Sequence, residues 1–281
     1  MPRPASSPCP LGGLAPAASR WAPIGCWRRG GVSTGPMGAS PVGVRRALPR
    51  RGAGGGRAPT MVEFRIRLYR EDDYEAVREV FATGMSEYVP ALCLHVLRQP
   101  WVLLVLGCTF CLLLASARSL LLPVLALTLL LALARHLLGY AWSTYIDRCL
   151  GDDLQDIAAT YAENAGAQFW VAEADERVVG TVGLRPADGT DGEVVLKRMS
   201  VRKDYRGLGI ATALGRTALA FARQRGCRAV VLNTLMLQHE ARALYERLGF
   251  RQQRHYVLPT IYGRLANCTI TTYRYDLSGT P

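Results

Sequence analysis

Acidic residues are missing from the first sixty positions of this chain. This stretch carries nine Arg and no Asp, Glu or Lys, whereas the remainder carries 25 of the 34 basic residues and all 22 acidic ones. The formal net charge of +12 is therefore concentrated in one segment, and the rest of the chain is nearly balanced. The nearly balanced charge of residues 61–281 does not favour binding of DNA or RNA, so we expect no nucleic-acid partner.

Other absences limit the possible domain organisation. The eight cysteines follow no regular spacing, which argues against a disulfide framework. Residues 1–60 lack a long apolar segment of the secretory kind and lack apolar periodicity, so we expect a disordered tail rich in Arg, Gly, Pro and Ala. The same composition also suits a mitochondrial transit peptide, and Met61 is an alternative start of the protein.

A glycine-containing stretch, Arg206–Ala211, lies between a strand-like run, Glu193–Val201, and a helix-like run, Ile210–Gln224. Glycines let a backbone approach a ligand closely, and the N–H groups of a first helical turn attract phosphate. The stretch lacks the Gly-Lys-Ser/Thr of a Walker loop, and Thr212 stands where a dinucleotide fingerprint needs its third glycine. Both of these common phosphate loops are therefore excluded.

The remaining pattern, Arg-x-x-Gly-x-Ala, resembles the pyrophosphate-binding loop of the GCN5-related N-acetyltransferases, which holds acetyl-CoA. The resemblance implies binding of acetyl-CoA as co-substrate, with no metal, by the side chains and backbone of Arg206, Gly207, Leu208, Gly209, Ile210 and Ala211. Met199 and Val201 resemble the positions whose backbone groups pair with pantetheine. Asn233 is a further candidate for a hydrogen bond to the co-substrate, although a turn asparagine is an equally good interpretation.

The order of the predicted elements agrees with this family. We expect strands at 62–68, 168–173, 177–184, 193–201, 228–233, 251–257 and 269–277. We expect helices that begin at residue 70 and end near Gly84–Glu87, that cover 140–165 with a break at Gly151–Asp153, and that cover 210–224 and 239–248. The stretch Ala243-Leu244-Tyr245-Glu246-x-x-Gly249-Phe250 resembles the family's penultimate helix. We therefore predict an α/β fold with a mixed central sheet flanked by helices, a domain at 61–281 and a tail at 1–60.

An apolar run of 34 residues, Trp101–Ala134, interrupts this domain and contains Arg118 as its only charge. Since one span needs about 20 apolar residues, the run predicts two shortish helices forming a membrane hairpin at about 101–134. Positive charge at both ends, from Arg98, Arg135 and His136, favours a cytosolic location for both. A buried helical pair and one long tilted span are the alternatives.

The motifs Gly84-Met85-x-Glu87-x-x-Pro90 and Asp153-Leu154-x-Asp156-Ile157, together with the inserted hairpin, resemble the camello-type membrane acetyltransferases. This group includes N-acetylaspartate synthases and cysteine-S-conjugate N-acetyltransferases. The resemblance implies an enzyme that acetylates a small carboxylate-bearing amino acid or conjugate, at the endoplasmic reticulum membrane with its catalytic domain facing the cytosol. A mitochondrial membrane is the alternative location, and a lysine acetyltransferase or an inactive membrane interaction protein are the alternative functions.

The resemblance also implies catalytic roles. Tyr245 matches the tyrosine that protonates the departing CoA thiolate. Glu193, Glu87 and Asp153 are candidates for the base or for acceptor binding, although a solvated face or a helix cap would also explain each carboxylate. Strict alternation along the strand places Leu196, Arg198 and Ser200 on one face and Lys197, Met199 and Val201 on the other, so Arg198 would either clamp an acceptor carboxylate or form a surface ion pair.

Overall fold

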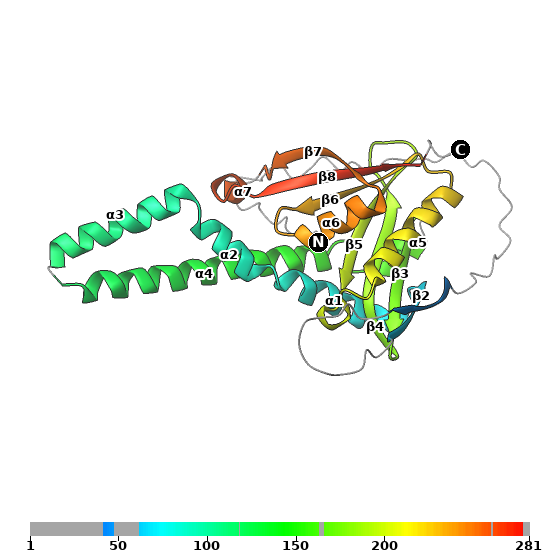
Figure 1. Cartoon of the computed structure of the whole chain (residues 1–281), viewed down its shortest axis with the longest axis horizontal. Coiled ribbons are helices and arrows are strands. Elements are labelled where there is room, and N and C mark those ends of the chain that lie inside the picture. The colour runs from blue at the N-terminus through cyan, green and yellow to red at the C-terminus, as the bar shows by residue number, and fades with distance from the viewer. Residues whose placement is uncertain (1–41, 48–61, 118, 163–165, 260, 278–281) are drawn as a thin grey trace, which may run out of the picture. The chain divides into compact units, whose positions relative to one another are not determined.

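The computed structural model describes residues 42–47, 62–117, 119–162, 166–259 and 261–277. These residues form one sheet with the strand order β1-β2-β3-β4-β5-β6-β8-β7 (Figure 1). Neighbouring strands are antiparallel except β5 and β6, which are parallel. The strands are β1 (Val42–Ala47), β2 (Val62–Leu68), β3 (Gln168–Ala174), β4 (Arg177–Pro186), β5 (Glu193–Val201), β6 (Ala229–Leu235), β7 (Arg251–Val257) and β8 (Thr269–Asp276).

Helices cover both faces of this sheet. One face packs against α5 and α6 through a cluster that includes Ile210, Leu214 and Leu244, and the other packs against α1 and the end of α4 through Val77 and Ile146. The predicted mixed sheet flanked by helices is therefore confirmed. The helices are α1 (Tyr74–Ser86), α2 (Val89–Leu97), α3 (Pro100–Ala117), α4 (Leu121–Leu150), α5 (Ile210–Gln224), α6 (His239–Leu248) and α7 (Ile261–Leu265), with short turns η1 (Glu71–Asp73), η2 (Ala158–Ala162) and η3 (Lys203–Tyr205).

Strand β1 lies in the segment that composition predicts to be disordered. Its six residues, Val42–Ala47, pair antiparallel with β2, and the disordered tail at 1–60 stays a prediction. An edge of β2 offers a row of unpaired backbone groups, which explains how a segment without apolar periodicity can add a strand. The rest of residues 1–60 lies outside the described residues.

A bulge in β5 breaks the alternation expected from the sequence. Thr181 pairs with Ser200 but Gly183 pairs with Lys197, so three positions of β5 span two of β4. Arg198 lies within the bulge with a left-handed φ of 56°, and its carbonyl accepts a hydrogen bond of 2.8 Å from the Thr181 hydroxyl. Because of the extra residue, Leu196, Met199 and Val201 all contact the same core cluster, so the predicted division of these residues between faces is wrong.

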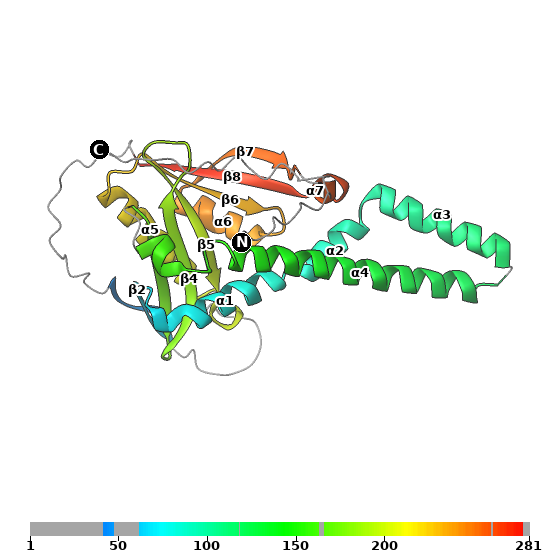
Figure 2. The same ribbon diagram turned by 180° about the vertical axis from the view of Figure 1, so that it is seen from behind.

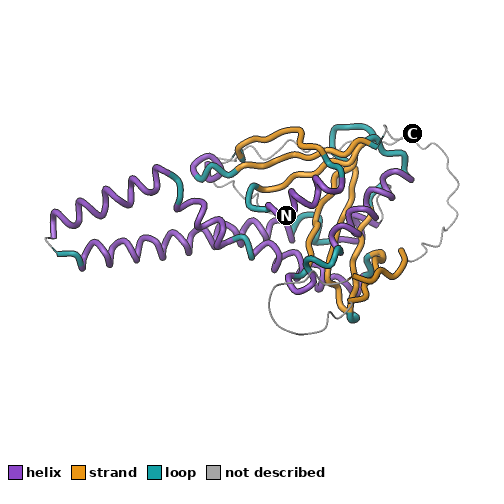
Figure 3. Tube along the Cα trace, in the orientation of Figure 1, coloured by secondary structure: helices purple, strands orange, loops and turns teal. Residues whose placement is uncertain are grey.

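The apolar run forms a helical hairpin, as predicted. Helices α3 and α4 contact each other and lie side by side in both views (Figures 1 and 2). Both arms are helical along their length in Figure 3. The second arm is longer than expected, since α4 has 30 residues and continues without interruption into the helix predicted from Tyr140. Arg118 lies outside the described residues.

The hairpin has no apolar core of its own. Helix α3 contains no buried residue, and large side chains such as Leu104, Leu112 and Leu121 are more than 60% exposed. The alternative of a buried helical pair is therefore wrong for the described residues. By length and composition, Glu71–Leu97, Pro100–Ala117 and Leu121–Leu150 could each cross a membrane. The first of these includes α1, whose apolar face packs on the sheet.

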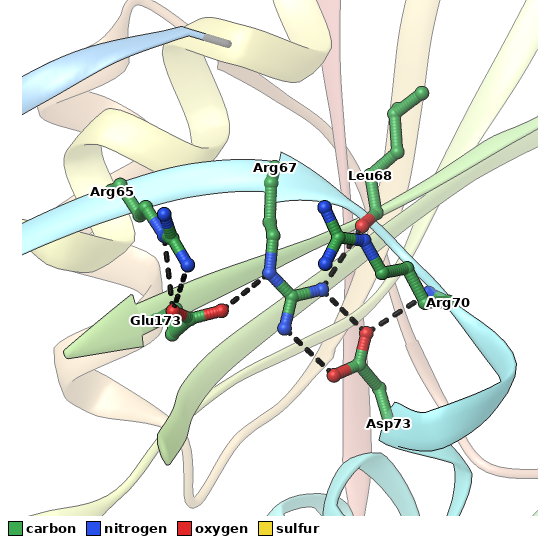
Figure 4. A network of polar contacts seen from close by, with 6 residues as sticks. All are labelled: Arg65, Arg67, Leu68, Arg70, Asp73 and Glu173. Carbon is green, nitrogen blue, oxygen red and sulfur yellow. Dashed lines mark hydrogen bonds and ion pairs between the residues drawn. The ribbon is translucent and has the colours of Figure 1, made fainter. Parts of the chain in front are cut away.

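A charged network fixes β2 to β3 and to the start of α1 (Figure 4). The Arg67 guanidinium contacts Glu173 on β3 and donates to both Asp73 carboxylate oxygens at 2.6 and 2.8 Å. Asp73 also accepts from the Arg70 backbone N–H at 2.9 Å. Each carboxylate is thus satisfied by several donors, which compensates for its partial removal from water. The network orients α1, which forms one wall of the site described next.

Candidate acetyl-CoA site

A cleft of about 370 Å³ lies where β5 ends and α5 begins. Residues from four parts of the chain line it: the α1–α2 region, the end of β5, the glycine loop and α6. Sites for organic ligands commonly have volumes of about 300–1,000 Å³. The lining residues are Phe81, Gly84, Met85, Tyr88, Met199, Ser200, Val201, Tyr205, Arg206, Gly207, Gly209, Ile210, Ala211, Thr212, Gln238, Glu240, Ala241, Leu244 and Arg247.

The glycine loop has the backbone geometry that a phosphate cradle requires. Gly207 and Gly209 both have a φ of 79°, in the left-handed region, and a Cβ at either position would meet no atom within 4 Å. Gly209 is the residue before α5, whose first turn carries no side-chain cap and no acidic residue. The N–H groups of that turn have no intrahelical partner by helix geometry, so they can bind an anion.

The second wall of the cleft is a free strand edge. Strand β5 pairs with β6 from Glu193 to Val195, and in the part of the chain that the structure describes no strand pairs with the residues beyond the bulge on that side. Met199 and Val201, predicted to contact pantetheine through their backbone, lie in this unpaired half and line the cleft. An extended ligand can form main-chain hydrogen bonds with such an edge.

Arg206 and Glu87 are brought together at the cleft. The Arg206 guanidinium donates to the two Glu87 oxygens at 2.7 and 3.1 Å, and its Nε donates to the Val201 carbonyl at 3.0 Å. The guanidinium is thereby held beside the glycine loop. Leu208, also predicted for this site, packs its side chain on the core, whereas Ile210 and Ala211 line the cleft.

Arg198 and Asp153 form a buried pair behind the cleft. Arg198 Nε lies 3.0 Å from both Asp153 oxygens, Nη2 and the Tyr161 hydroxyl also donate to Asp153, and the guanidinium stacks 4.7 Å from the Phe81 ring centre. Burial would raise the pKa of Asp153, but the bonds and charges of Arg198, with Lys197 and Tyr161, lower it to about 2. Since neither residue lines the cleft, their predicted roles in acceptor binding stay predictions.

Two predicted residues lie away from the cleft. Glu193 begins β5, at the end opposite the glycine loop, and accepts a hydrogen bond of 2.6 Å from Arg274. Asn233 is exposed on β6 and accepts from the Thr272 hydroxyl at 2.8 Å. Each therefore has a structural partner, and their predicted roles as base and as co-substrate contact stay predictions.

Tyr245 lies on α6 with its ring in the core, 5.6 Å from the Phe250 ring and 6.4 Å from the Tyr273 ring. Burial raises the pKa of its hydroxyl, and nearby Tyr88 raises it further. The raised pKa keeps this hydroxyl protonated at neutral pH. Tyr245 is not among the residues that line the cleft, so its predicted role as the proton donor stays a prediction.

Sequence reasoning missed several cleft residues. Tyr88 lies inside the Gly84–Pro90 motif, and Gln238 precedes α6, where its side chain accepts from the Leu235 N–H at 3.1 Å and donates to Met85 Sδ at 3.9 Å. Arg247 lies three residues after Leu244, on the same face of α6. That helical spacing was a usable signal for Arg247, whereas nothing local marks Tyr88 or Gln238.

An open strand edge beside a glycine loop at a helix N-terminus is the arrangement expected of an acetyltransferase of the GNAT class. The model of the acetyltransferase (GNAT) family matches residues 132–250. The probable N-acetyltransferase camello of Xenopus tropicalis is 39% identical over 217 residues, which are 77% of this chain and 99% of that protein. N-acetyltransferase 8 of Rattus norvegicus is 42% identical over 196 residues, which are 68% of this chain and 88% of that protein.

The chain therefore belongs to the camello-type N-acetyltransferases and is an acetyltransferase. The family prediction made from the loop, the Tyr245 helix and the Gly84–Pro90 motif is confirmed. Enzymes of the GNAT family use acetyl-CoA, which agrees with the anion-binding geometry of the cleft.

The glycine loop generates a paired prediction. Gly209→Ala should raise the KM for acetyl-CoA about tenfold or more, because a methyl group would enter the open space beside the loop and the left-handed backbone would be strained by about 1–2 kcal/mol. Gly226→Ala is the matched control, since Gly226 also has a left-handed φ, of 68°, and open space around it but does not line the cleft. Both variants should melt at lower temperature, and an equal rise of KM in both would contradict the assignment.

The buried pair generates a stability prediction. Asp153→Asn should lower the free energy of unfolding at pH 7 by about 3–5 kcal/mol, because Arg198 would remain buried without its counter-charge. The folded-state pKa of Asp153, about 2, is below its ordinary value of 3.8, so its stabilisation is complete above pH 3.8 and is lost as the pH falls towards 2. The difference in the free energy of unfolding between Asp153→Asn and the wild type should therefore become smaller between pH 3.8 and pH 2. Asp152→Asn, at a side chain 66% exposed, should change stability little at any pH.

Proposed function

We propose that this protein is a membrane-anchored enzyme that transfers acetyl from acetyl-CoA to the amino group of a small carboxylate-bearing amino acid or conjugate, aspartate-like or a cysteine S-conjugate. One observation carries the proposal. The glycine loop and the unpaired half of β5 line the same cleft, so one ligand can place its phosphates at the first and its extended arm along the second.

In this proposal the pyrophosphate of acetyl-CoA binds the N–H groups at the start of α5, with Arg206 beside it. The pantetheine arm pairs with the backbone of Met199 and Val201 and brings the thioester towards Tyr245. The acceptor amine attacks the thioester carbonyl carbon, the C–S bond breaks, and the thiolate takes a proton from the Tyr245 hydroxyl. The attacking nitrogen loses its surplus proton to water, and the Tyr245 phenolate regains a proton from water. Glu193, Glu87 and Asp153, the candidate bases, are each paired with an arginine.

An α-amine suits this arrangement better than a lysine amine. With an ordinary pKa of about 7.7–8.0, an α-amine is partly neutral at physiological pH, whereas a lysine amine at about 10.4 is almost wholly protonated. A weak base is then sufficient. The name of the rat relative, N-acetyltransferase 8, agrees with acetylation of an amine.

The hairpin supports membrane anchoring. Helix α3 has 18 residues and therefore a length of about 27 Å, close to the hydrocarbon thickness of about 30 Å. Its surface of exposed leucines would be costly in water and matches acyl chains. We propose insertion from the cytosolic face of the endoplasmic reticulum, where acetyl-CoA is available to the cleft.

A panel of acceptors with labelled acetyl-CoA tests the function. Purified protein should acetylate aspartate-like amino acids or cysteine S-conjugates with a kcat/KM at least tenfold above that for lysine-containing peptides, because the latter amines are mostly charged. A higher kcat/KM for lysine-containing peptides would contradict this substrate class and indicate a protein lysine acetyltransferase. If no acceptor were acetylated and acetyl-CoA did not raise the melting temperature, the result would favour an inactive membrane interaction protein.

Tyr245→Phe tests the proposed acid. The kcat should fall about a hundredfold or more while the KM for acetyl-CoA changes little, since only the proton donor is lost. Tyr273→Phe is the matched control, because this neighbouring buried tyrosine bonds Glu246 at 2.8 Å and should affect melting temperature rather than kcat. An unchanged kcat in Tyr245→Phe would remove this residue from the mechanism.

A further inference from the structure

The base of the hairpin is joined to a distant part of the chain, the connection between β7 and β8 that contains α7. The Trp101 indole N–H donates to the Leu265 carbonyl at 2.9 Å, and His95 Nε2 lies 2.8 Å from the Ala266 carbonyl. These residues are more than 160 positions apart in sequence. The connection therefore lies directly beside the first turn of α3.

The surface at this junction combines exposed apolar side chains with exposed positive charge. Leu94 and Trp101 are each 48% exposed, and Leu265 is 54% exposed. Arg98 and Arg264 are exposed as well, and neither takes part in an ion pair within the described ranges. We call Leu94, Arg98, Trp101, Arg264 and Leu265 the junction patch.

We propose that the junction patch binds the headgroup and glycerol region of a lipid bilayer, so that the connection containing α7 lies on the membrane beside the hairpin. This inference rests on the proposed insertion of the hairpin. If α3 crosses the bilayer, Trp101, its second residue, lies at the membrane interface, where Trp is enriched. The 2.9 Å bond then brings the Leu265 carbonyl to the same depth.

The composition of the patch fits this occupant. Leucine side chains at the interface bury apolar surface among the upper parts of the acyl chains, and the Trp indole sits at headgroup level. The two exposed arginines suit anionic headgroups, because a negatively charged membrane surface attracts basic side chains close to it. The patch is also continuous with the hairpin, so its burial requires no second membrane or separate partner.

Lipid contact can be tested with the full chain in phosphatidylcholine–phosphatidylserine vesicles. Leu265 is replaced by photoreactive p-benzoylphenylalanine, and lipid adducts are measured by mass spectrometry after illumination. Leu112, 71% exposed on α3, is the positive control position. Gln253, exposed on β7 but outside the patch, is the negative control position. The rise in melting temperature with acetyl-CoA verifies that each variant is folded.

We expect lipid adducts when the photoreactive residue is at position 112 or 265, and at least several-fold fewer when it is at position 253. Adducts at 112 but not at 265 would overturn the inference and leave the hairpin in the membrane. Crosslinks from 265 to protein rather than lipid would also overturn it, because the patch would then be a protein interface. An absence of adducts at 112 would instead contradict the proposed membrane insertion.

Discussion

The separation of β5 from β6 is the constraint on which the site depends. The two strands pair over three residues, from Glu193 to Val195, and then part. If pairing continued along β5, the edge at Met199 and Val201 would be occupied and the cleft would close. The bulge around Arg198 accompanies this separation and turns Met199 and Val201 towards the core cluster that α5 and α6 cover. The Asp153–Arg198 pair and the bond from Thr181 hold the strained residue in place.

The cleft wall opposite β5 is built on the hairpin. Trp142 of α4 donates to the Met85 carbonyl at 2.9 Å, and Met85 lines the cleft. Arg78 of α1 donates to the carbonyl of Leu150, the last residue of α4, and to that of Leu154 in the following turn, both at 2.7 Å. Helix α4, the second arm of the hairpin, therefore helps to position a wall of the site.

Local patterns predicted most of the elements because each depends on periodicity and end signals. The strands of the sheet, the amphipathic α5 and the Gly249 end of α6 follow from residues within a few positions. The glycine loop was also predictable, since its backbone conformation requires Gly207 and Gly209. The bulge was not, because alternation extrapolates a regular strand. The pairing of Asp153 with Arg198, and the presence of Tyr88 in the cleft, depend on contacts between distant segments that no local pattern encodes.

The pairing of Arg206 with Glu87 has a consequence for how an anionic ligand is selected. The Arg206 guanidinium, proposed to lie beside the phosphates, is already paired with a carboxylate held in bidentate contact. A ligand that binds there gains less from long-range attraction than it would from a free arginine, and more from the oriented N–H groups of the α5 start. Recognition at this cleft should therefore depend more on shape and hydrogen-bond direction than on the net charge of the ligand.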